Sequence, residues 1–411
     1  LHKEYRRQRQ MCIRDSGSGL LQAAELAPLP GLADSIDAYR RLVGDALGEG
    51  QAVWQLGPER YRVAPAAQPP QEGAQRVSDA APIGQWLSKR LIAPLQASIG
   101  ARRRLIVSPD GALAMLPFEA LPVDGELLAQ RHSVGYVQSL SMMELLQRRS
   151  ASYGRLPPRK AMLAIGNPVY EGQAGAAQPS GKRGAAAGDD ALLSARASAE
   201  SEEGIGAAVE ELRENSWENL PGTQRELESI ARVFRHRQID LISGADATEQ
   251  NLQRLDRGGE LAKYRHLLFS VHGYLSPSVP ALSALVLGQV DNPPSVDGYV
   301  TAAEWPGYTL RSDLVVMSAC ETGIGKVVAG DGVMGLPYAL YVAGNVNTVM
   351  TLWPVSDEST ARFMEAFFAR IERKLPVERA LAETKRAFAE GEYGERLRKP
   401  VYWAPFVLYG T

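Results

Sequence analysis

A histidine and a cysteine in this sequence each follow directly on a run of apolar residues. His272 comes after the run 266–271 (HLLFSV), and Cys320 comes after the run 313–319 (DLVVMSA). The thiolate of a cysteine is a nucleophile, and a nearby imidazole can lower the pKa of the thiol and later protonate a leaving amine. The two residue types therefore predict a Cys–His pair that hydrolyses an amide bond.

Two backbone amides are the expected donors to the oxyanion that forms in such a reaction. Gly273 follows the histidine directly, so no side chain obstructs its N–H, and the N–H of Cys320 is the second expected donor. Removing one donor from an oxyanion hole typically costs about 10²- to 10³-fold in rate.

Both residues also have a plain structural interpretation. A buried cysteine at a strand end is commonly a small, inert apolar residue, and His272 could be a hydrogen-bonded residue at the end of its strand. His266, at the head of the same strand, is interpreted as structural. The separation 320 − 272 = 48 leaves room for a crossover connection between two neighbouring parallel strands, whose carboxyl ends are where sites form in open α/β sheets.

The elements that must position these residues alternate between strands and helices. A hairpin is predicted at 52–64, and one helix begins at a capping box formed by Thr223 and Glu226. Further helices are predicted at about 84–98, 357–372 and 376–390. Apolar strands are predicted within 103–111 and at 161–165, 238–242, 266–271, 313–318 and 347–352. Because several of these strands are uniformly apolar, we expect an α/β fold whose mostly parallel sheet has helices on both faces.

The predicted organisation has three parts. Residues 1–20 are interpreted as a non-native or disordered leader, 21–150 as an N-terminal part with the hairpin, and 151–411 as the core that carries the reactive residues. The stretch at about 171–206 is rich in Ala, Gly and Ser and has almost no large apolar residues, so it is predicted to be a mobile insertion.

Composition excludes several classes of function. The 45 Lys and Arg nearly balance the 47 Asp and Glu, for a formal charge of −2, so neither nucleic acid nor a membrane is an expected partner. With two cysteines, the chain offers no Cys₂His₂-type zinc site and no disulfide framework. The segment 323–326 (GIGK) lacks the remaining residues of a phosphate loop, so no bound nucleotide is expected. Together with the missing zinc site, this leads us to expect neither metal nor cofactor. No apolar run reaches the 18 residues of a spanning helix, and a cytoplasmic protein is expected.

The sequence resembles the CHAT family, caspase-like domains related to separase and the caspases. The resemblance rests on LLFSVHGYL, VVMSACETGIGKVVAGDGVMGLPYAL, TLWPVSDES and the terminal YWAPFVLYG, in family order, and it extends over most of residues 35–411. It implies a caspase-like sheet, with His272 as catalytic histidine, Cys320 as nucleophile, and the amides of Gly273 and Cys320 as oxyanion donors. Members often carry repeats that sense an activating partner, so an activating protein or an N-terminal sensor region is an implied partner.

Two acidic residues are candidates for binding a basic residue of a substrate. The resemblance to separase places Asp357 after Trp353 and Pro354, where separases carry a second acid in place of Pro354. Asp331, in a glycine-flanked turn, is the other candidate. The structural alternatives are helix N-capping for Asp357 and turn formation for Asp331. We expect a cysteine endopeptidase that cleaves protein substrates after basic residues. The alternative is a non-catalytic caspase-like module that binds other proteins.

Overall fold

The computed structural model describes residues 10–14, 21–25, 29–45, 50–170, 212, 215–274, 276, 279–318 and 335–411. Cys320, Asp331 and the predicted insertion at about 171–206 lie outside the described residues, as does the side chain of Asp357.

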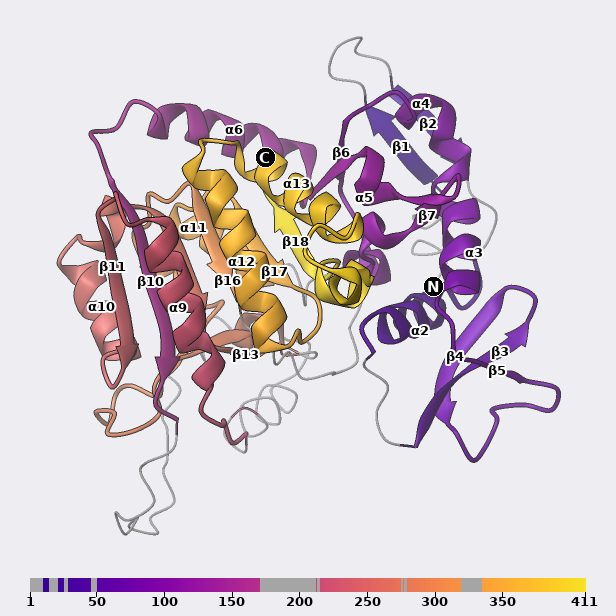
Figure 1. The fold of residues 1–411 in the computed structure, drawn as a ribbon, viewed down its shortest axis with the longest axis horizontal. Helices are drawn as coiled ribbons and strands as arrows, with labels where there is room; N and C mark the ends of the chain where they lie inside the picture. Colours follow the sequence, from indigo (N-terminus) through magenta and orange to yellow (C-terminus); the bar gives the residue numbers. More distant parts are fainter. Residues whose placement is uncertain are drawn as a thin grey trace. The chain divides into compact units, whose positions relative to one another are not determined.

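An eight-stranded sheet forms the core of the fold (Figure 1). Its strands, in spatial order, are β11 (Ile239–Gly244), β10 (Lys160–Pro168), β12 (Tyr264–Ser270), β16 (Leu314–Met317), β17 (Thr348–Thr351), β18 (Phe406–Tyr409), β9 (Ser133–Tyr136) and β6 (Arg104–Val107). The pairs from β11 to β17 are parallel, and β18 runs antiparallel to β17. The prediction of a mostly parallel sheet is therefore confirmed.

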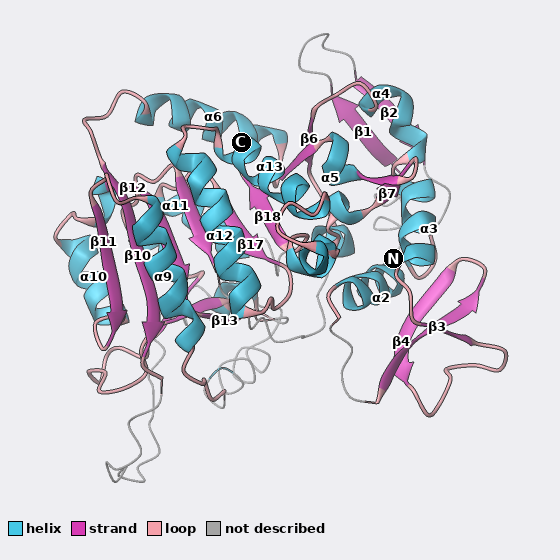
Figure 2. Ribbon diagram, in the orientation of Figure 1, coloured by secondary structure: helices cyan, strands magenta, loops and turns pink. Residues whose placement is uncertain are grey.

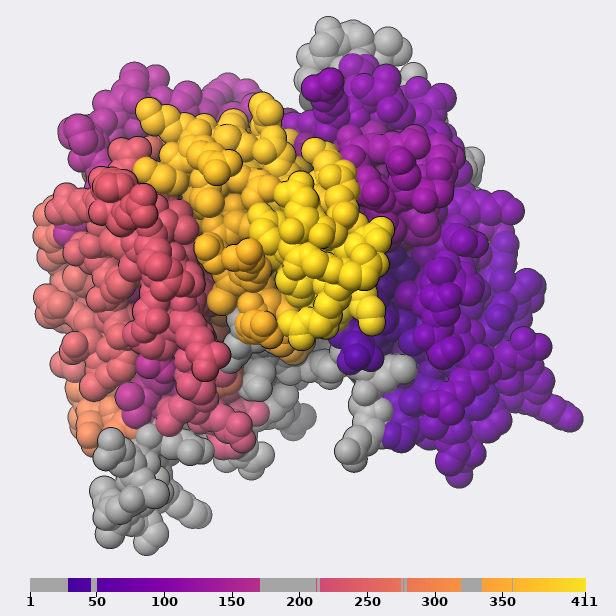
Figure 3. Space-filling model, in the orientation of Figure 1, coloured from indigo at the N-terminus to yellow at the C-terminus, as the bar shows by residue number. Residues whose placement is uncertain are grey.

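Helices lie on both faces of this sheet. On one face α9 (Pro221–Val233) and α12 (Asp357–Glu372) pack side by side, and on the other lie α10 (Glu249–Arg257) and α11 (Gly335–Ala343) (Figure 1). In the space-filling view, α9 and α12 cover most of the strands beneath them (Figure 3). Phe363 of α12 stacks on Phe406 of β18 with ring centroids 3.9 Å apart, which holds this helix against the sheet.

A small antiparallel sheet follows β12 in the chain. It contains β13 (His272–Tyr274), β14 (Ala284–Val286) and β15 (Tyr299–Thr301). Strands of three residues are too short to show the alternation that identifies a strand in a sequence, and this sheet was not predicted. It matters for function because its first residue is His272.

The N-terminal part holds the predicted hairpin. Strands β3 (Gln51–Gly57) and β4 (Arg60–Pro65) pair antiparallel, and β5 (Gln75–Val77) extends the pair to three strands (Figure 2). Strand β1 (Gln10–Arg14), within the range predicted as a leader, pairs with β2 (Leu21–Glu25). The remaining short strands are β7 (Pro122–Val123) and β8 (Glu126–Leu127). Among the described residues, the remaining α-helices are α2 (Leu32–Val43), α3 (Ala81–Leu91), α4 (Gln96–Ile99), α5 (Leu128–Arg131), α6 (Leu140–Tyr153) and α13 (Val377–Ala389).

The chain divides into two compact units. The first comprises 1–106, 115–134 and 385–404, and the second comprises 107–114, 135–384 and 405–411. In the first unit, Lys385 and Glu119 form a fully buried ion pair with Nζ and Oε1 2.6 Å apart. Burial lowers the pKa of Lys385, against the raising effect of Glu119. All described residues of the candidate site belong to the second unit.

Candidate functional site

The strands that precede His272 and Cys320 are neighbours in the sheet. Strands β12 and β16 are parallel and in register from His266↔Leu314 to Phe269↔Met317. The N–H of Ser318 continues the pairing by donating to the carbonyl oxygen of Phe269 at 2.8 Å. The carboxyl ends of the two strands therefore lie side by side, as the predicted site requires.

The imidazole of His272 is held by a backbone carbonyl group. Its Nε2 lies 2.7 Å from the carbonyl oxygen of Glu218, and the residue is 1% exposed. A carbonyl oxygen only accepts hydrogen bonds, so in the neutral ring the proton is on Nε2 and Nδ1 is the basic nitrogen. The contact fixes both the orientation and the tautomer of the ring.

Two aromatic rings enclose the imidazole. The ring centroids of Tyr170 and Trp217 lie 4.8 and 5.0 Å from that of His272, in tilted arrangements. The indole Nε1–H of Trp217 donates to the hydroxyl oxygen of Tyr299 at 2.9 Å, and this hydroxyl donates to the carbonyl oxygen of Leu212. Because each polar end of these aromatic side chains has a buried partner, the rings form fixed walls.

The hydroxyl of Tyr170 also ties β13 to β14. It accepts a hydrogen bond from the backbone N–H of His272 at 3.0 Å and donates to the carbonyl oxygen of Val286 at 2.8 Å. His272 and Val286 are register partners, so the tyrosine hydroxyl links the two strands at the catalytic candidate. The backbone N–H of Tyr170 donates in turn to Oδ1 of Asn219.

A buried carboxylate lies between the ends of β12 and β16. Oε2 of Glu226, on α9, accepts hydrogen bonds from Oγ of Ser270 at 2.6 Å and from Oγ of Ser318 at 3.2 Å. The predicted capping box of Thr223 and Glu226 is therefore wrong. The N-cap is Leu220, three residues before Thr223, the helix begins at Pro221, and Thr223 donates its hydroxyl to the carbonyl oxygen of Leu220.

The remaining predicted residues differ in how far the structure describes them. Gly273 is buried in β13 opposite Leu285. Asp357 is the first residue of α12, and the N-cap is Ser356, so the structural alternative that made Asp357 the N-cap is wrong by one residue. Placement of the nucleophile candidate Cys320 and of Asp331 stays a prediction.

His266, at the amino end of β12, has different surroundings. It is 6% exposed, and desolvation lowers the pKa of its imidazole to about 4. Among the described residues, its Nδ1 has no hydrogen-bond partner. At neutral pH this ring is therefore an uncharged residue of the core.

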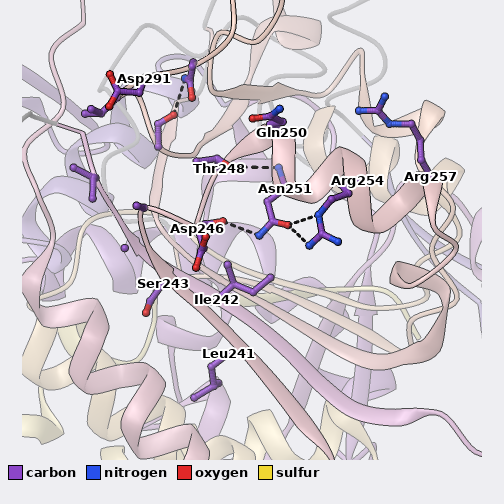
Figure 4. A pocket seen from close by; sticks show the side chains of 16 residues that line it. Leu241, Ile242, Ser243, Asp246, Thr248, Gln250, Asn251, Arg254, Arg257 and Asp291 are labelled. Carbon is purple, nitrogen blue, oxygen red and sulfur yellow. Dashed lines mark hydrogen bonds between the residues drawn. The ribbon is translucent and has the colours of Figure 1, made fainter.

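A separate groove of about 1080 Å³ opens beside the edge strand β11 (Figure 4). Its lining includes the end of β11 from Leu241 to Gly244 and polar residues of α10. There Asn251 donates to the carbonyl oxygen of Asp246 and accepts from Arg254 at 2.6 Å. His272 is not among the lining residues, so the groove is distinct from the site at β12 and β16.

The described ranges contain neither a membrane-spanning helix nor a cluster of possible metal ligands. In those ranges, no helix combines the length and apolar character needed to cross a membrane. Nor do three or more His, Cys, Asp or Glu side chains of the described residues gather where they could hold a metal ion.

Comparison with known proteins places the sequence in a family. The model of the CHAT domain matches residues 81–411. Tetratricopeptide repeat protein 28 from Mus musculus is 30% identical over 121 residues, and the Homo sapiens protein is 31% identical over the same length. These matches take in 29% of this chain and 5% of each relative, so the chain spans a small part of the length of these relatives.

Two solved structures of the Saccharomyces cerevisiae separase–securin complex also show similarity to this chain. One has a TM-score of 0.38 at 15% identity and covers 72% of this chain and 14% of that chain. A second has a TM-score of 0.36 at 16% identity and covers 73% of this chain and 15% of that chain.

Proposed function

The chain belongs to the CHAT domain family, and we propose that it is a cysteine endopeptidase with Cys320 as nucleophile and His272 as general base and acid. Family membership makes it a caspase-like module. The proposal adds catalysis, the residues that perform it, and a protein as the substrate.

The observation that carries the proposal is the register between β12 and β16. Paired residues differ by 314 − 266 = 48 positions, and the two reactive residues differ by the same 320 − 272 = 48. His272 and Cys320 each follow the last register pair, Phe269↔Met317, by three residues. Equal distance beyond paired positions of adjacent parallel strands supports a close approach of imidazole and thiol.

The hydrogen bond to Glu218 suits His272 to both proton transfers. With Nε2–H donated to the carbonyl oxygen, Nδ1 can take the thiol proton of Cys320, and the carbonyl dipole stabilises the resulting imidazolium. The thiolate attacks the substrate carbonyl carbon, and the amides of Gly273 and Cys320 donate to the oxyanion. Collapse breaks the C–N bond as His272 gives its proton to the leaving amine. Water, deprotonated by His272, then hydrolyses the thioester.

Specificity for basic residues belongs to the same proposal. A carboxylate at Asp357 or Asp331 would hold an Arg or Lys side chain through a charge-assisted hydrogen bond. Asp357 begins α12, which packs beside α9 on the sheet. An activating protein or sensor region would act on this module from outside the matched residues 81–411.

A second candidate function is a binding module that does not turn over. The observation in its favour is the enclosure of His272, whose 1% exposure leaves little of the ring accessible to a substrate. The two functions differ in the reactivity of Cys320, because a catalytic thiol must ionise with help from His272.

Alkylation of Cys320 by a peptidyl electrophile distinguishes them. We expect modification well above the rate of an unfolded control and a marked loss of rate in His272→Ala. All proteins should carry Cys12→Ser, because the chain has two cysteines and Cys320 would then be the single thiol. A rate equal to that of the unfolded chain, unchanged by His272→Ala, would establish the binding module instead.

A cleavage profile then identifies the substrate class. Incubating a peptide library with the enzyme and with Cys320→Ala should give cleavages only with the intact thiol, and after Arg or Lys. Cleavage after other residues would remove the basic preference while leaving the peptidase assignment in place.

A further inference from the structure

We infer that Glu226 is a positioning residue, whose carboxylate clamps together the ends of β12 and β16 and so sets the spacing between His272 and Cys320. The inference rests on the proposed function, and it concerns a residue that touches neither substrate nor reacting atoms.

The hydrogen bonds of Glu226 connect the two strands that precede His272 and Cys320. One oxygen, Oε2 of Glu226, accepts from the hydroxyl groups of both Ser270 and Ser318. Ser270 stands two residues before His272 (272 − 270 = 2), and Ser318 stands two residues before Cys320 (320 − 318 = 2). The carboxyl group therefore joins the last residue of β12 to the residue that follows β16.

Burial makes this contact strong and directional. Glu226 is 3% exposed, Ser318 is 4% exposed and Ser270 is fully buried. A buried carboxylate is costly unless hydrogen bonds compensate its lost hydration, and bonds from a neutral donor to a charged acceptor are about twice as strong as neutral pairs. Displacing either serine hydroxyl would remove a hydrogen bond from a buried carboxyl oxygen, so the two strand ends are held at one separation.

Other side chains of α9 already hold the helix on the sheet. Leu227 and Ile230 are buried on the same helix, with exposures of 1% and 0%. An apolar residue at position 226 would serve the same packing without the cost of desolvating a charge. What the carboxylate adds is a fixed direction toward both serines, which is what positioning requires.

The expected consequence is a loss of coupling between imidazole and thiol. A displacement of about 1 Å between reacting groups can cost about 10²-fold in rate. Weakening the clamp should thus lower the assistance that His272 gives to Cys320, while the fold and the intrinsic thiol remain.

The experiment measures that assistance directly. In the Cys12→Ser background, the rate at which iodoacetamide alkylates Cys320 is measured with His272 intact and in His272→Ala. The first rate divided by the second is the coupling ratio. We expect Glu226→Gln to lower this ratio about 10-fold or more. Glu228→Gln is the matched control, since Glu228 lies on the same helix, is exposed, and accepts only from Gln224 among the described residues.

The two serines provide milder variants and a second readout. Ser270→Ala and Ser318→Ala should each lower the ratio, and combining either with Glu226→Gln should add little, because the residues act as one unit. If Glu226→Gln does not fold, judged by circular dichroism, the serine variants carry the test alone. A general loss of stability would not change the ratio among folded molecules.

The outcomes separate this inference from the proposed function. A wild-type ratio near one would show that His272 does not assist Cys320, and both the proposed peptidase function and the positioning role of Glu226 would fail. A high wild-type ratio that persists in Glu226→Gln and in both serine variants would overturn the clamp alone. A ratio lowered in these variants and preserved in Glu228→Gln supports it.

Discussion

The two ends of strand β12 hold their polar groups in opposite ways. At the amino end, ion pairs dominate: Lys160 lies 2.7 Å from Asp240, and Asp313 bridges Arg159 and Arg265. The exposure of these side chains ranges from 9% at Arg159 to 53% at Arg265, and Asp240 is 41% exposed. Opposite charges near solvent are cheap to place, and they contribute little individually.

At the carboxyl end, the groups are buried and the contacts are directional. Glu226 accepts from two serine hydroxyls, and His272 lies between two aromatic rings with Nε2 against a backbone carbonyl. Each of these contacts fixes an orientation, which a solvated ion pair does not. The amino end of the strand therefore carries mainly ion pairs, which contribute modest stability, and the carboxyl end carries buried contacts that fix orientations.

The sharpest test of this contrast compares His266, at the amino end of β12, with His272, two residues beyond its carboxyl end. His272→Ala should lower kcat/KM for peptide hydrolysis by about 10²- to 10⁴-fold, the usual contribution of a general acid and base. His266→Gln should leave kcat/KM at the wild-type value, since its buried imidazole lies at the opposite end. Steady-state kinetics on both variants measures this, and an equal loss in the two would erase the distinction.

Substitution of Trp217, one of the two aromatic residues that enclose His272, should lower the free energy of unfolding substantially. Trp217→Ala is expected to cost about 3–5 kcal/mol of unfolding free energy, as truncation of a buried tryptophan does. It also removes the indole donor to Tyr299. Trp217→Phe keeps a ring beside His272 and should cost clearly less. Urea denaturation measures both, and equal costs would show that the ring contact is unimportant.

Protonation of His266, at the amino end of β12, should make the free energy of unfolding depend on pH. The pKa of His266 is lowered to about 4 in the folded state, from the ordinary value near 6.5. The folded state therefore binds fewer protons, and stability is fully present above pH 6.5 and is lost as pH falls toward 4. In that window the loss approaches about 1.4 kcal/mol per pH unit.

Denaturation at a series of pH values measures this slope. His266→Gln should flatten the profile between pH 6.5 and 4, with His236, which is exposed, as the control position. An unchanged slope in His266→Gln would show that another group governs the acid limb.

The smallest expected effect concerns the ion pair at the start of the strand. Asp240→Asn removes the partner of Lys160 and of the Tyr264 hydroxyl, and should cost about 0.2–1 kcal/mol because the pair is partly exposed. The cost should shrink in high salt. A loss of several kcal/mol, or any loss of hydrolysis, would contradict the comparison.

The large sheet could be predicted because its central strands are uniformly apolar. The runs at 161–165, 238–242, 266–271, 313–318 and 347–352 all proved to be strands of one sheet. Burial on both faces produces that pattern, so the sequence carries it directly.

The surroundings of His272 could not be predicted, for physical reasons. Glu218 acts through its carbonyl oxygen, which every residue has, so its identity gives no signal. Tyr170 is 102 positions away from His272 in the chain, and nothing local marks their contact. The spacing of Thr223 and Glu226 suggested a cap, but tertiary partners at Ser270 and Ser318 determined where the carboxylate points.

Both chain segments that border the range 171–211 are fastened beside the same imidazole. Tyr170, on one side, bonds to the backbone of His272, while Leu212, on the other, accepts from the tyrosine that Trp217 binds. Because positions 170 and 212 are both tied to the surroundings of His272, a break in the chain between them would leave both new segments attached to the same part of the fold. A purified protein nicked between these anchors should therefore elute as one species on size exclusion.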